Sequence, residues 1–364
     1  MIDSITIENF RCFDKTTVKG FGLINLIGGK NNSGKTVLLE AVLLNQSPTN
    51  DVIELVQNLR GEDDKTRSAL GDKAWDSLFY MQENNKQIKI TSITQDTNHE
   101  VLIYCDKNYT EFSELIDEKT VNDPKIIEFK NKAVISNNIV LHIDGKSSTM
   151  GETSSLIILN DGGKFRKNNY SINSKPLGFV ASNVRIDQSD IARDFDIAYE
   201  NGFFTQIING LNIIDSSIKD ARTSTSAGKA RIILARENEK FMPLSLFGDA
   251  ITKILDITLT IITAKDSLVL IDEIENGIHH SSQQTFWRHL IKLARAFNVQ
   301  VFATTHSEEM IKALNTVALG SEYESDVMYF EMAKHAKTNK IKGIATDMRT
   351  LQSKLYSNTP YRGE

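Results

Sequence analysis

The chain has 364 residues, of which 40% are hydrophobic and 24% charged, and this composition excludes a disordered protein. Lysine and arginine total 42 against 47 acidic residues, so a net charge of -5 leaves only local patches for nucleic-acid contact. Cys12 and Cys105 lack the spacing of a metal site or a disulfide framework, and no segment has the roughly 18 apolar residues of a membrane helix. A cytoplasmic protein is therefore predicted.

The first motif is the glycine-rich sequence GGKNNSGKT at residues 28–36, between an apolar run at 23–27 and a helix-like run at 37–44. It matches GxxxxGK[ST], a loop whose backbone N–H groups surround phosphate oxygens at the positive end of the following helix. Lys35 would contact the β and γ phosphates of ATP, and the Thr36 hydroxyl would bind Mg²⁺. The residues predicted to hold the nucleotide are Gly29, Asn31, Asn32, Ser33, Gly34, Lys35 and Thr36.

The middle of the chain is longer than a compact P-loop core requires, which indicates an inserted segment. Five strand-like runs occupy residues 87–91, 101–104, 133–135, 139–143 and 156–159. Polar turns at 144–146 and 161–163 separate some of them, so the pattern predicts antiparallel β structure. Helical spacing follows from 187 to 217, and the absence of sustained heptads excludes long coiled-coil arms. The hydroxyl-rich run 223–228 predicts a mobile loop.

A second motif follows the apolar run 267–271, which is typical of a buried strand and ends in Asp272 and Glu273. Two carboxylates at the end of a buried strand are costly unless they bind something. Asp272 would hold Mg²⁺, and Glu273 would polarise the attacking water as a general base. The alternative is an ordinary acidic turn, which the presence of the P-loop disfavours.

A third strand-like run at 299–305 leads into His306, which could donate a hydrogen bond to the γ phosphate. Taken alone, such a histidine is more often structural, but its position after the other two motifs favours the functional role. Two further runs at 328–332 and 342–345 predict a hairpin around the basic turn 334–340. This turn could contact DNA phosphates, although a solvated turn is the more common use of such a sequence.

The segments IENFRCF, GGKNNSGKT, LIDEIENGIHH and ATTHS together resemble the ABC-type ATPase heads of RecF, SMC and OLD-like proteins. The nearest likeness is to the bacterial OLD-like ATP-binding proteins, many of them encoded in anti-phage systems. The resemblance implies a head-to-head dimer in which each ATP lies between the P-loop of one subunit and the signature helix of the other. It also implies that Arg11 lies near the nucleotide, that Asp272 and Glu273 form the Walker B pair, that His306 is the switch histidine, and that His279 faces the other subunit.

The family's signature, an LSGGQ-like or SxGDG-like run, has its candidate at residues 244–250, where Ser245 and Gly248 precede a helix-like run. The N-terminal N–H groups of that helix could bind the γ phosphate held by the opposite subunit. Ala250 stands where a second glycine is common, and the alternative is an ordinary helix N-cap. Gln82 is a candidate for the Q-loop glutamine of this family.

The sequence therefore predicts an α/β P-loop NTPase of the ABC-ATPase head type, with an inserted antiparallel β and helical lobe. The predicted parts are a first ATPase lobe (1–84), the inserted lobe (85–240), the signature helix, Walker B and switch histidine (241–320), and a C-terminal hairpin and helix (321–364). The last part is too short for the Toprim nuclease that full-length OLD proteins carry.

The predicted function is an ATP-binding and ATP-hydrolysing molecular switch that controls a separate nuclease or toxin in anti-phage defence. The switch is expected to be a head-to-head dimer or a higher homo-oligomer. One alternative is a RecF-like DNA repair ATPase, which the net charge mildly disfavours. The other is a non-hydrolysing scaffold that uses ATP only for dimerisation, and Glu273 argues against it because a scaffold needs no general base.

Overall fold

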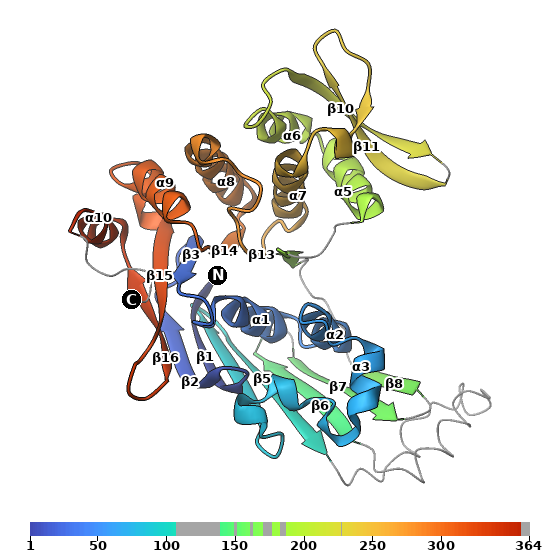
Figure 1. Cartoon of the computed structure of the whole chain (residues 1–364), viewed down its shortest axis with the longest axis vertical. Coiled ribbons are helices and arrows are strands. Elements are labelled where there is room, and N and C mark those ends of the chain that lie inside the picture. The colour runs from blue at the N-terminus through green and yellow to red at the C-terminus, as the bar shows by residue number, and fades with distance from the viewer. Residues whose placement is uncertain are drawn as a thin grey trace.

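A mostly parallel six-stranded sheet forms the centre of the computed structural model, which describes residues 1–106, 139–148, 151–160, 163–169, 177–182, 187–226 and 228–357 (Figure 1). In spatial order its strands are β16 (Ile341–Thr346), β15 (Val327–Lys334), β3 (Ile24–Gly29), β14 (Gln300–Thr304), β13 (Leu268–Ile271) and β9 (Gly178–Val180). Only β16 is antiparallel to its neighbour. The carboxyl ends of β3, β13 and β14 therefore meet at one edge, and this edge carries all three predicted motifs.

Both faces of this sheet are covered, which explains why its central strands are continuous apolar runs. Val269 and Ile271 of β13 pack into a core shared with α7, α8 and α9, whereas Leu268 and Leu270 pack into a second core with α1. The helices are α1 (Lys35–Gln46), α7 (Asp249–Thr263), α8 (Gln283–Phe297), α9 (Glu308–Ala318) and α10 (Met348–Tyr356). In the part of the chain that the structure describes, no helix has the length and apolarity needed to cross a membrane.

A seven-stranded antiparallel sheet lies beneath α1, α2 and α3 (Figure 1). In spatial order it contains β2 (Phe13–Lys19), β1 (Ile2–Phe10), β4 (Ile88–Thr94), β5 (Asn98–Asp106), β6 (Ile139–Ser147), β7 (Gly151–Asn160) and β8 (Gly163–Asn169), and the helices are α2 (Asn50–Asn58) and α3 (Asp64–Leu70). The predicted strand 133–135 lies outside the described residues. In this sheet β1 pairs with β4, although the sequence predicts the two strands in different lobes, divided between residues 84 and 85. The four domain ranges expected from the sequence stay a prediction.

The prediction of a turn at 144–146 is wrong, because these residues lie inside β6 and pair with β7. Gly145 is needed there for close packing rather than for a turn. A side chain on Gly145 would lie 2.4 Å from Oγ1 of Thr153 and 2.8 Å from Cγ of Pro48. A glycine inside a strand often marks a site where another part of the protein approaches the backbone closely.

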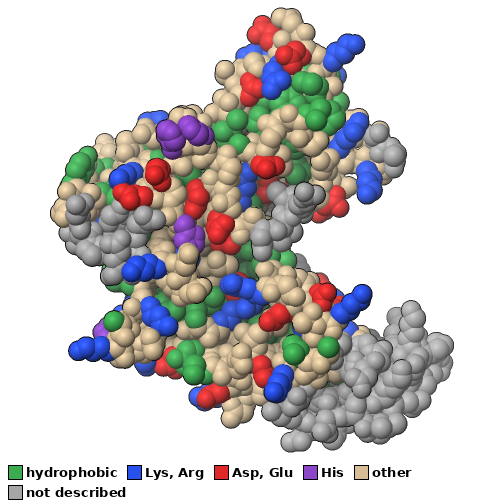
Figure 2. Space-filling model, in the orientation of Figure 1, with side chains coloured by type: hydrophobic (Ala, Val, Ile, Leu, Met, Phe, Trp, Pro, Cys, Tyr) green, Lys and Arg blue, Asp and Glu red, His purple; other side chains and the backbone are tan. Residues whose placement is uncertain are grey.

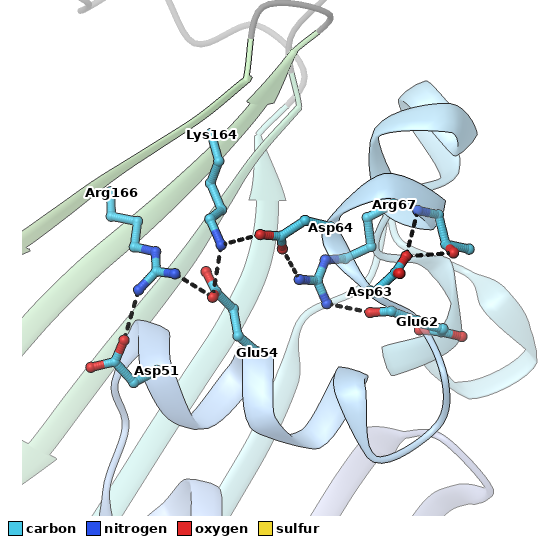
Figure 3. A network of polar contacts seen from close by, with 9 residues as sticks. Asp51, Glu54, Glu62, Asp63, Asp64, Arg67, Lys164 and Arg166 are labelled. Atoms are coloured by element: carbon cyan, nitrogen blue, oxygen red, sulfur yellow. Dashed lines mark hydrogen bonds and ion pairs between the residues drawn. The ribbon is translucent and has the colours of Figure 1, made fainter. Parts of the chain in front are cut away.

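A polar network ties the two helices α2 and α3 to the far edge of this sheet (Figure 3). Lys164 of β8 donates to Glu54 of α2 at 2.8 Å and to Asp64 of α3 at 2.7 Å. Arg166, two residues along the same strand face, binds Asp51 at 2.7 Å and also Glu54. Because Glu54 is buried and both cations converge on it, the network fixes α2 and α3 against the sheet.

The upper part of the molecule in Figure 1 consists of helices packed against a small three-stranded sheet. These elements are α5 (Gln188–Glu200), α6 (Phe204–Leu211), β10 (Ile218–Ser226), β11 (Lys229–Arg236) and β12 (Met242–Pro243). The helical prediction for 187–217 holds as two helices that end at Leu211. The mobile loop predicted at 223–228 is wrong for residues 223–226, which form the end of β10 and pair with β11. The predicted C-terminal hairpin is confirmed as β15 and β16.

The acidic side chain of Asp256 is half-buried where α7 packs against α5. Burial is the largest effect on the pKa of Asp256 and raises it. The charge of Lys253 lowers this pKa and that of Asp194 raises it, and the net pKa is about 7. This folded pKa lies above the ordinary value of 3.8, so between these pH values the folded protein binds a proton that the unfolded chain does not. The free energy of unfolding therefore falls as pH rises through this window.

We expect Asp256→Asn, which mimics the protonated carboxyl, to stabilise the protein at pH 8 by up to about 4 kcal/mol and by less at pH 5. Urea unfolding at both pH values measures the difference. The exposed residue Asp196 of α5 offers a control for the loss of an acidic side chain, since Asp196→Asn at an exposed position should change stability by less than about 0.5 kcal/mol. The same gain for Asp256→Asn at both pH values would contradict the buried-carboxyl interpretation.

Candidate functional site

The P-loop leaves the carboxyl end of β3 and enters α1 through backbone conformations that favour glycine. Gly29 has a φ of 144° and Gly34 a φ of 90°. A side chain on Gly29 would lie 2.5 Å from the carbonyl oxygen of Met332, and one on Gly34 would lie 2.9 Å from the ring of Phe13. Only glycine fits these two positions, and the resulting loop wraps closely around the N-terminus of α1, where N–H groups can bind an anion.

Two side chains in the loop have the chemistry that phosphate oxygens require. The ammonium of Lys35, only 5% exposed, donates to the carbonyl oxygens of Gly29 and Lys30 at 2.9 Å each. The hydroxyl of Ser33 is also buried and has no hydrogen-bond partner among the described residues. Leaving such a hydroxyl unpaired costs about 1–3 kcal/mol. A phosphate in the loop would accept from both groups, so the residues present fit a nucleotide.

The carboxylate of Asp272 lies at the end of β13, within reach of the P-loop helix. The hydroxyl of Thr36 donates to its Oδ1 at 3.1 Å, and the hydroxyl of Thr304 donates to the same oxygen at 2.6 Å. Its other oxygen, Oδ2, accepts from Ser182 at 3.0 Å. The structure thus brings together Thr36 and Asp272, the two predicted metal ligands, and a hydroxyl beside a carboxylate suits Mg²⁺.

Glu273 follows in a strained conformation, with a φ of 47° in the left-handed region. Its N–H donates to the hydroxyl of Thr304 at 2.9 Å, and its carboxylate accepts from the amide of Asn276 at 2.8 Å. This turn forms one wall of a cavity of about 580 Å³ beside the P-loop. The cavity is lined by Gly29, Lys30, Asn31, Glu273, Glu275, Asn276 and His306.

His306 follows the end of β14 and lines the same cavity as the P-loop. Burial and then the Lys35 ammonium lower the pKa of His306, while Glu275, Glu273 and Asp272 raise it. The net pKa lies below the ordinary value of 6.5, so the imidazole is mostly neutral at pH 7. A neutral imidazole still carries one N–H that can donate to a phosphate oxygen.

Arg11 lies next to the P-loop in the fold, but its guanidinium points to a carboxylate instead of the cavity. Its Nε is 2.8 Å from Oε2 of Glu40 in α1, and Arg60 binds the other oxygen of Glu40 at 2.9 Å. Arg11 and Gln82 line a second cavity of about 360 Å³, and none of its lining residues belongs to the P-loop cavity. The proximity of Arg11 to a nucleotide stays a prediction.

The signature candidates lie on the exposed surface, and neither lines the P-loop cavity of its own chain. Ser245 belongs to a short 3-10 turn, Leu244–Leu246, and Gly248 precedes α7 with a φ of 89°. His279 is exposed near the start of α8, with its ring centroid 4.1 Å from that of His280. Figure 2 shows the molecule hollowed between its upper and lower parts, with charged side chains of both signs on either side of the hollow.

Three residues that contact the predicted site were not identified from the sequence. Thr304 lies in the ATTHS run, where a hydroxyl at a strand end was the available signal. Glu275 is the third acid of DEIEN and could have been found from that charge density. Ser182 has no such signal, because only the pairing of β9 with β13 brings it to Asp272.

Comparison with known proteins is consistent with this geometry. The family model described as "AAA domain, putative AbiEii toxin, Type IV TA system" matches residues 24–311. A Helicobacter pylori protein named "ATP/GTP phosphatase" is 27% identical over 348 residues, which cover 91% of this chain and 92% of that protein. An uncharacterized protein of Methanocaldococcus jannaschii is 33% identical over 96 residues, or 26% of this chain and 43% of that protein.

Two solved structures of SMC heads align with most of the chain. The first, bound to the C-terminal winged-helix domain of ScpA, has a TM-score of 0.49 and 10% identity and covers 97% of this chain and 99% of that chain. The SMC head domain from Thermotoga maritima has a TM-score of 0.40 and 10% identity, and the alignment covers 95% of this chain and 99% of that chain. Because the family model spans well over half of the residues, this chain belongs to that family of AAA domains and is a P-loop ATPase.

Proposed function

We propose that the chain is an ATP-binding and ATP-hydrolysing molecular switch that acts as a head-to-head dimer. The observation that supports this most strongly is the contact at 3.1 Å between Thr36 of the P-loop helix and Asp272 of β13, beside the cavity lined by Glu273 and His306. Two motifs far apart in the sequence meet there with the residue types that phosphoryl transfer requires.

In the proposed binding step, Lys35 exchanges its two carbonyl partners for oxygens of the β and γ phosphates. The N–H groups at the start of α1 and the buried hydroxyl of Ser33 donate to the same phosphates. Thr36 and Asp272 would hold Mg²⁺, which when bound neutralises charge on the β and γ oxygens. The hydroxyls of Thr304 and Ser182 keep the Asp272 carboxylate oriented toward the P-loop.

In the proposed hydrolysis step, Glu273 accepts a proton from the attacking water as the water oxygen forms a bond to the γ phosphorus. The bond from the γ phosphorus to the bridging oxygen breaks, and ADP and phosphate leave. Asn276 holds the Glu273 carboxylate from one side at 2.8 Å. The imidazole of His306 donates an N–H to a γ oxygen, and in this way it distinguishes ATP from ADP.

The dimer is proposed because the signature candidates are exposed and lie outside the P-loop cavity of their own chain. Leu246, between Ser245 and Gly248, is 69% exposed, and burial of this side chain against a second subunit would be favourable. The N-terminus of α7 would then point at the γ phosphate of the other subunit.

The biological setting that we propose is OLD-like anti-phage defence, in which the nucleotide state controls a separate effector protein. In support of this setting, the description of the matching family names a toxin and a type IV TA system. In the described residues, the chemical groups that converge on the cavity suit nucleotide handling and form no second catalytic set. The switch therefore requires a partner to produce an effect.

The dimer and its composite sites can be tested by mixing two inactive variants. Lys35→Ala disables the P-loop, and Ser245→Asp places a negative charge where the γ phosphate of the partner would bind. Each variant alone should hydrolyse ATP at less than about 1% of the wild-type rate, because a composite site loses a required half. Random pairing makes half of the dimers mixed with one intact site each, so the mixture should recover about a quarter of wild-type activity.

Phosphate release is measured before and after mixing in the absence of nucleotide, which allows the subunits to exchange. Ser216 is an exposed serine in the same part of the molecule, and Ser216→Asp should retain full activity as the matched control. Recovery of no activity in the mixture would show that each site is complete within one subunit.

A further inference from the structure

The turn after β13 contains a third carboxylate to which the proposed mechanism assigns no role. Asp272, Glu273 and Glu275 lie within four consecutive residues. Glu275 lines the P-loop cavity, and its Oε1 accepts the backbone N–H of His306 at 2.6 Å. Its Oε2 is buried and has no hydrogen-bond partner among the described residues.

This arrangement is unfavourable for the stability of the turn. A buried acceptor without a donor costs about 1–3 kcal/mol, and three carboxylates so close together repel one another. The cation of Lys253 in α7 offsets part of this repulsion, since its Nζ lies 3.5 Å from the carbonyl oxygen of Asp272. A local cost of this kind is expected where a side chain serves function rather than stability.

Glu275 contacts the point in the chain that determines where the imidazole of His306 lies. His306 stands between the end of β14 and Ser307, whose hydroxyl caps α9 by accepting from the N–H of Met310 at 3.1 Å. At the end of β14, Thr304 accepts two hydrogen bonds from the turn after β13. The N–H of Ile274 donates to its carbonyl oxygen at 3.0 Å, and the N–H of Glu273 donates to its hydroxyl at 2.9 Å. The hydrogen bond from the N–H of His306 to Glu275 adds a third contact between this turn and the chain that follows β14, and it is made by the proposed switch residue.

We propose that Glu275 is a positioning residue of the nucleotide site, which fixes the backbone of His306 so that its imidazole meets the γ phosphate. This inference rests on the proposed function, because it takes His306 to be the residue that detects that phosphate. Glu275 itself does not contact the reacting atoms in this role. Its loss should therefore affect the recognition of ATP and leave the recognition of ADP intact.

The first test compares Glu275→Ala with Glu275→Gln. Affinities for a non-hydrolysable ATP analogue and for ADP are measured by calorimetry, together with the turnover rate. In Glu275→Ala the ratio of ATP-analogue affinity to ADP affinity should fall about tenfold, as expected for the loss of one buried hydrogen bond, and kcat should also fall. Glu275→Gln keeps an amide oxygen that can accept the N–H of His306, so it should restore most of the ratio.

Unchanged ADP affinity in Glu275→Ala serves as the check that the variant folds. Glu309, exposed in α9 and bound to Ser307 at 2.9 Å, provides the matched control, and Glu309→Ala should leave the ratio unchanged. An equal loss of ATP-analogue and ADP affinity in Glu275→Ala would mean that Glu275 has only a structural role, and the inference would be overturned.

A double-mutant cycle shows whether Glu275 acts through His306. His306→Ala should lower the affinity ratio as much as Glu275→Ala does, and the double variant should lose nothing more. Losses that add in the double variant would overturn the inference while leaving the proposed function standing. A His306→Ala protein with an unchanged ratio would instead remove the γ-phosphate contact from the proposed function, and the inference would fail with it.

Discussion

Replacing Lys35 with alanine is expected to abolish measurable binding of ATP. In the folded protein this ammonium is almost fully buried and held by the carbonyl oxygens of Gly29 and Lys30. Without the cation, the phosphates would meet these carbonyl oxygens and the nearby Asp272 with only backbone N–H dipoles to offset their charge. A charged hydrogen bond in such a site contributes several kcal/mol, so we expect the affinity to fall more than about 100-fold.

Calorimetric titration with ATP and Mg²⁺ measures this effect. Lys30 supplies the matched control, because it is a lysine of the same loop and lines the cavity but is exposed. Lys30→Ala should weaken binding by less than about tenfold, since exposed charges interact weakly through water. Undiminished ATP affinity in Lys35→Ala would contradict the assignment of the loop as a nucleotide site.

The three strands that carry the motifs, and the positions of those motifs, could be predicted because each depends on local sequence, whereas β9 of the same sheet was not predicted. The apolar runs at 23–27, 267–271 and 299–305 are long enough for buried strands, and each ends in the polar residues of a motif. Parallel strands place their carboxyl ends at one edge, so predicting the strands also predicted that Thr36 and Asp272 would lie close together.

The features that were missed depend on packing and strand pairing that local composition does not reveal. The sequence DGK at 144–146 has the composition of a turn, but the glycine is there because Pro48 packs against it. The run 223–226 is rich in serine and threonine, which suits a loop, yet pairing with β11 makes it a strand. Pro48 lies far from Gly145 in the sequence, whereas β11 directly follows the run 223–226, whose hydroxyl-rich composition concealed the hairpin.

The site residues divide in the same way. The roles proposed for Lys35 and Glu273 follow from their own positions in a motif, whereas Glu275 contacts His306 only because β13 and β14 are adjacent. Arg11 has a contact that the sequence did not indicate. Its partner Glu40 is a buried acid in α1 that the P-loop pattern does not specify, and the proximity of Arg11 to a nucleotide stays a prediction.

Glu273→Gln is expected to bind ATP with near wild-type affinity and to lower kcat more than about 100-fold. The amide has nearly the same shape as the carboxylate, and its oxygen can still accept from Asn276. An amide cannot take a proton from water at neutral pH, so the general base is lost while the binding contacts of the P-loop remain. ATP affinity and phosphate release are measured on the same preparation, and wild-type turnover would show that another group activates the water.

This variant should also hold the protein in its ATP-bound state, which makes the proposed switch measurable. Light scattering should show dimers that persist with ATP, since hydrolysis no longer returns the protein to the ADP state. ATP can shift the affinity for an effector only if it binds the two states of the switch differently. A pull-down of the product of the neighbouring gene should therefore recover different amounts with ATP and with ADP, and the difference should be larger for Glu273→Gln than for the wild type. Equal recovery in the presence and absence of nucleotide would refute the proposal that the ATPase controls a separate effector.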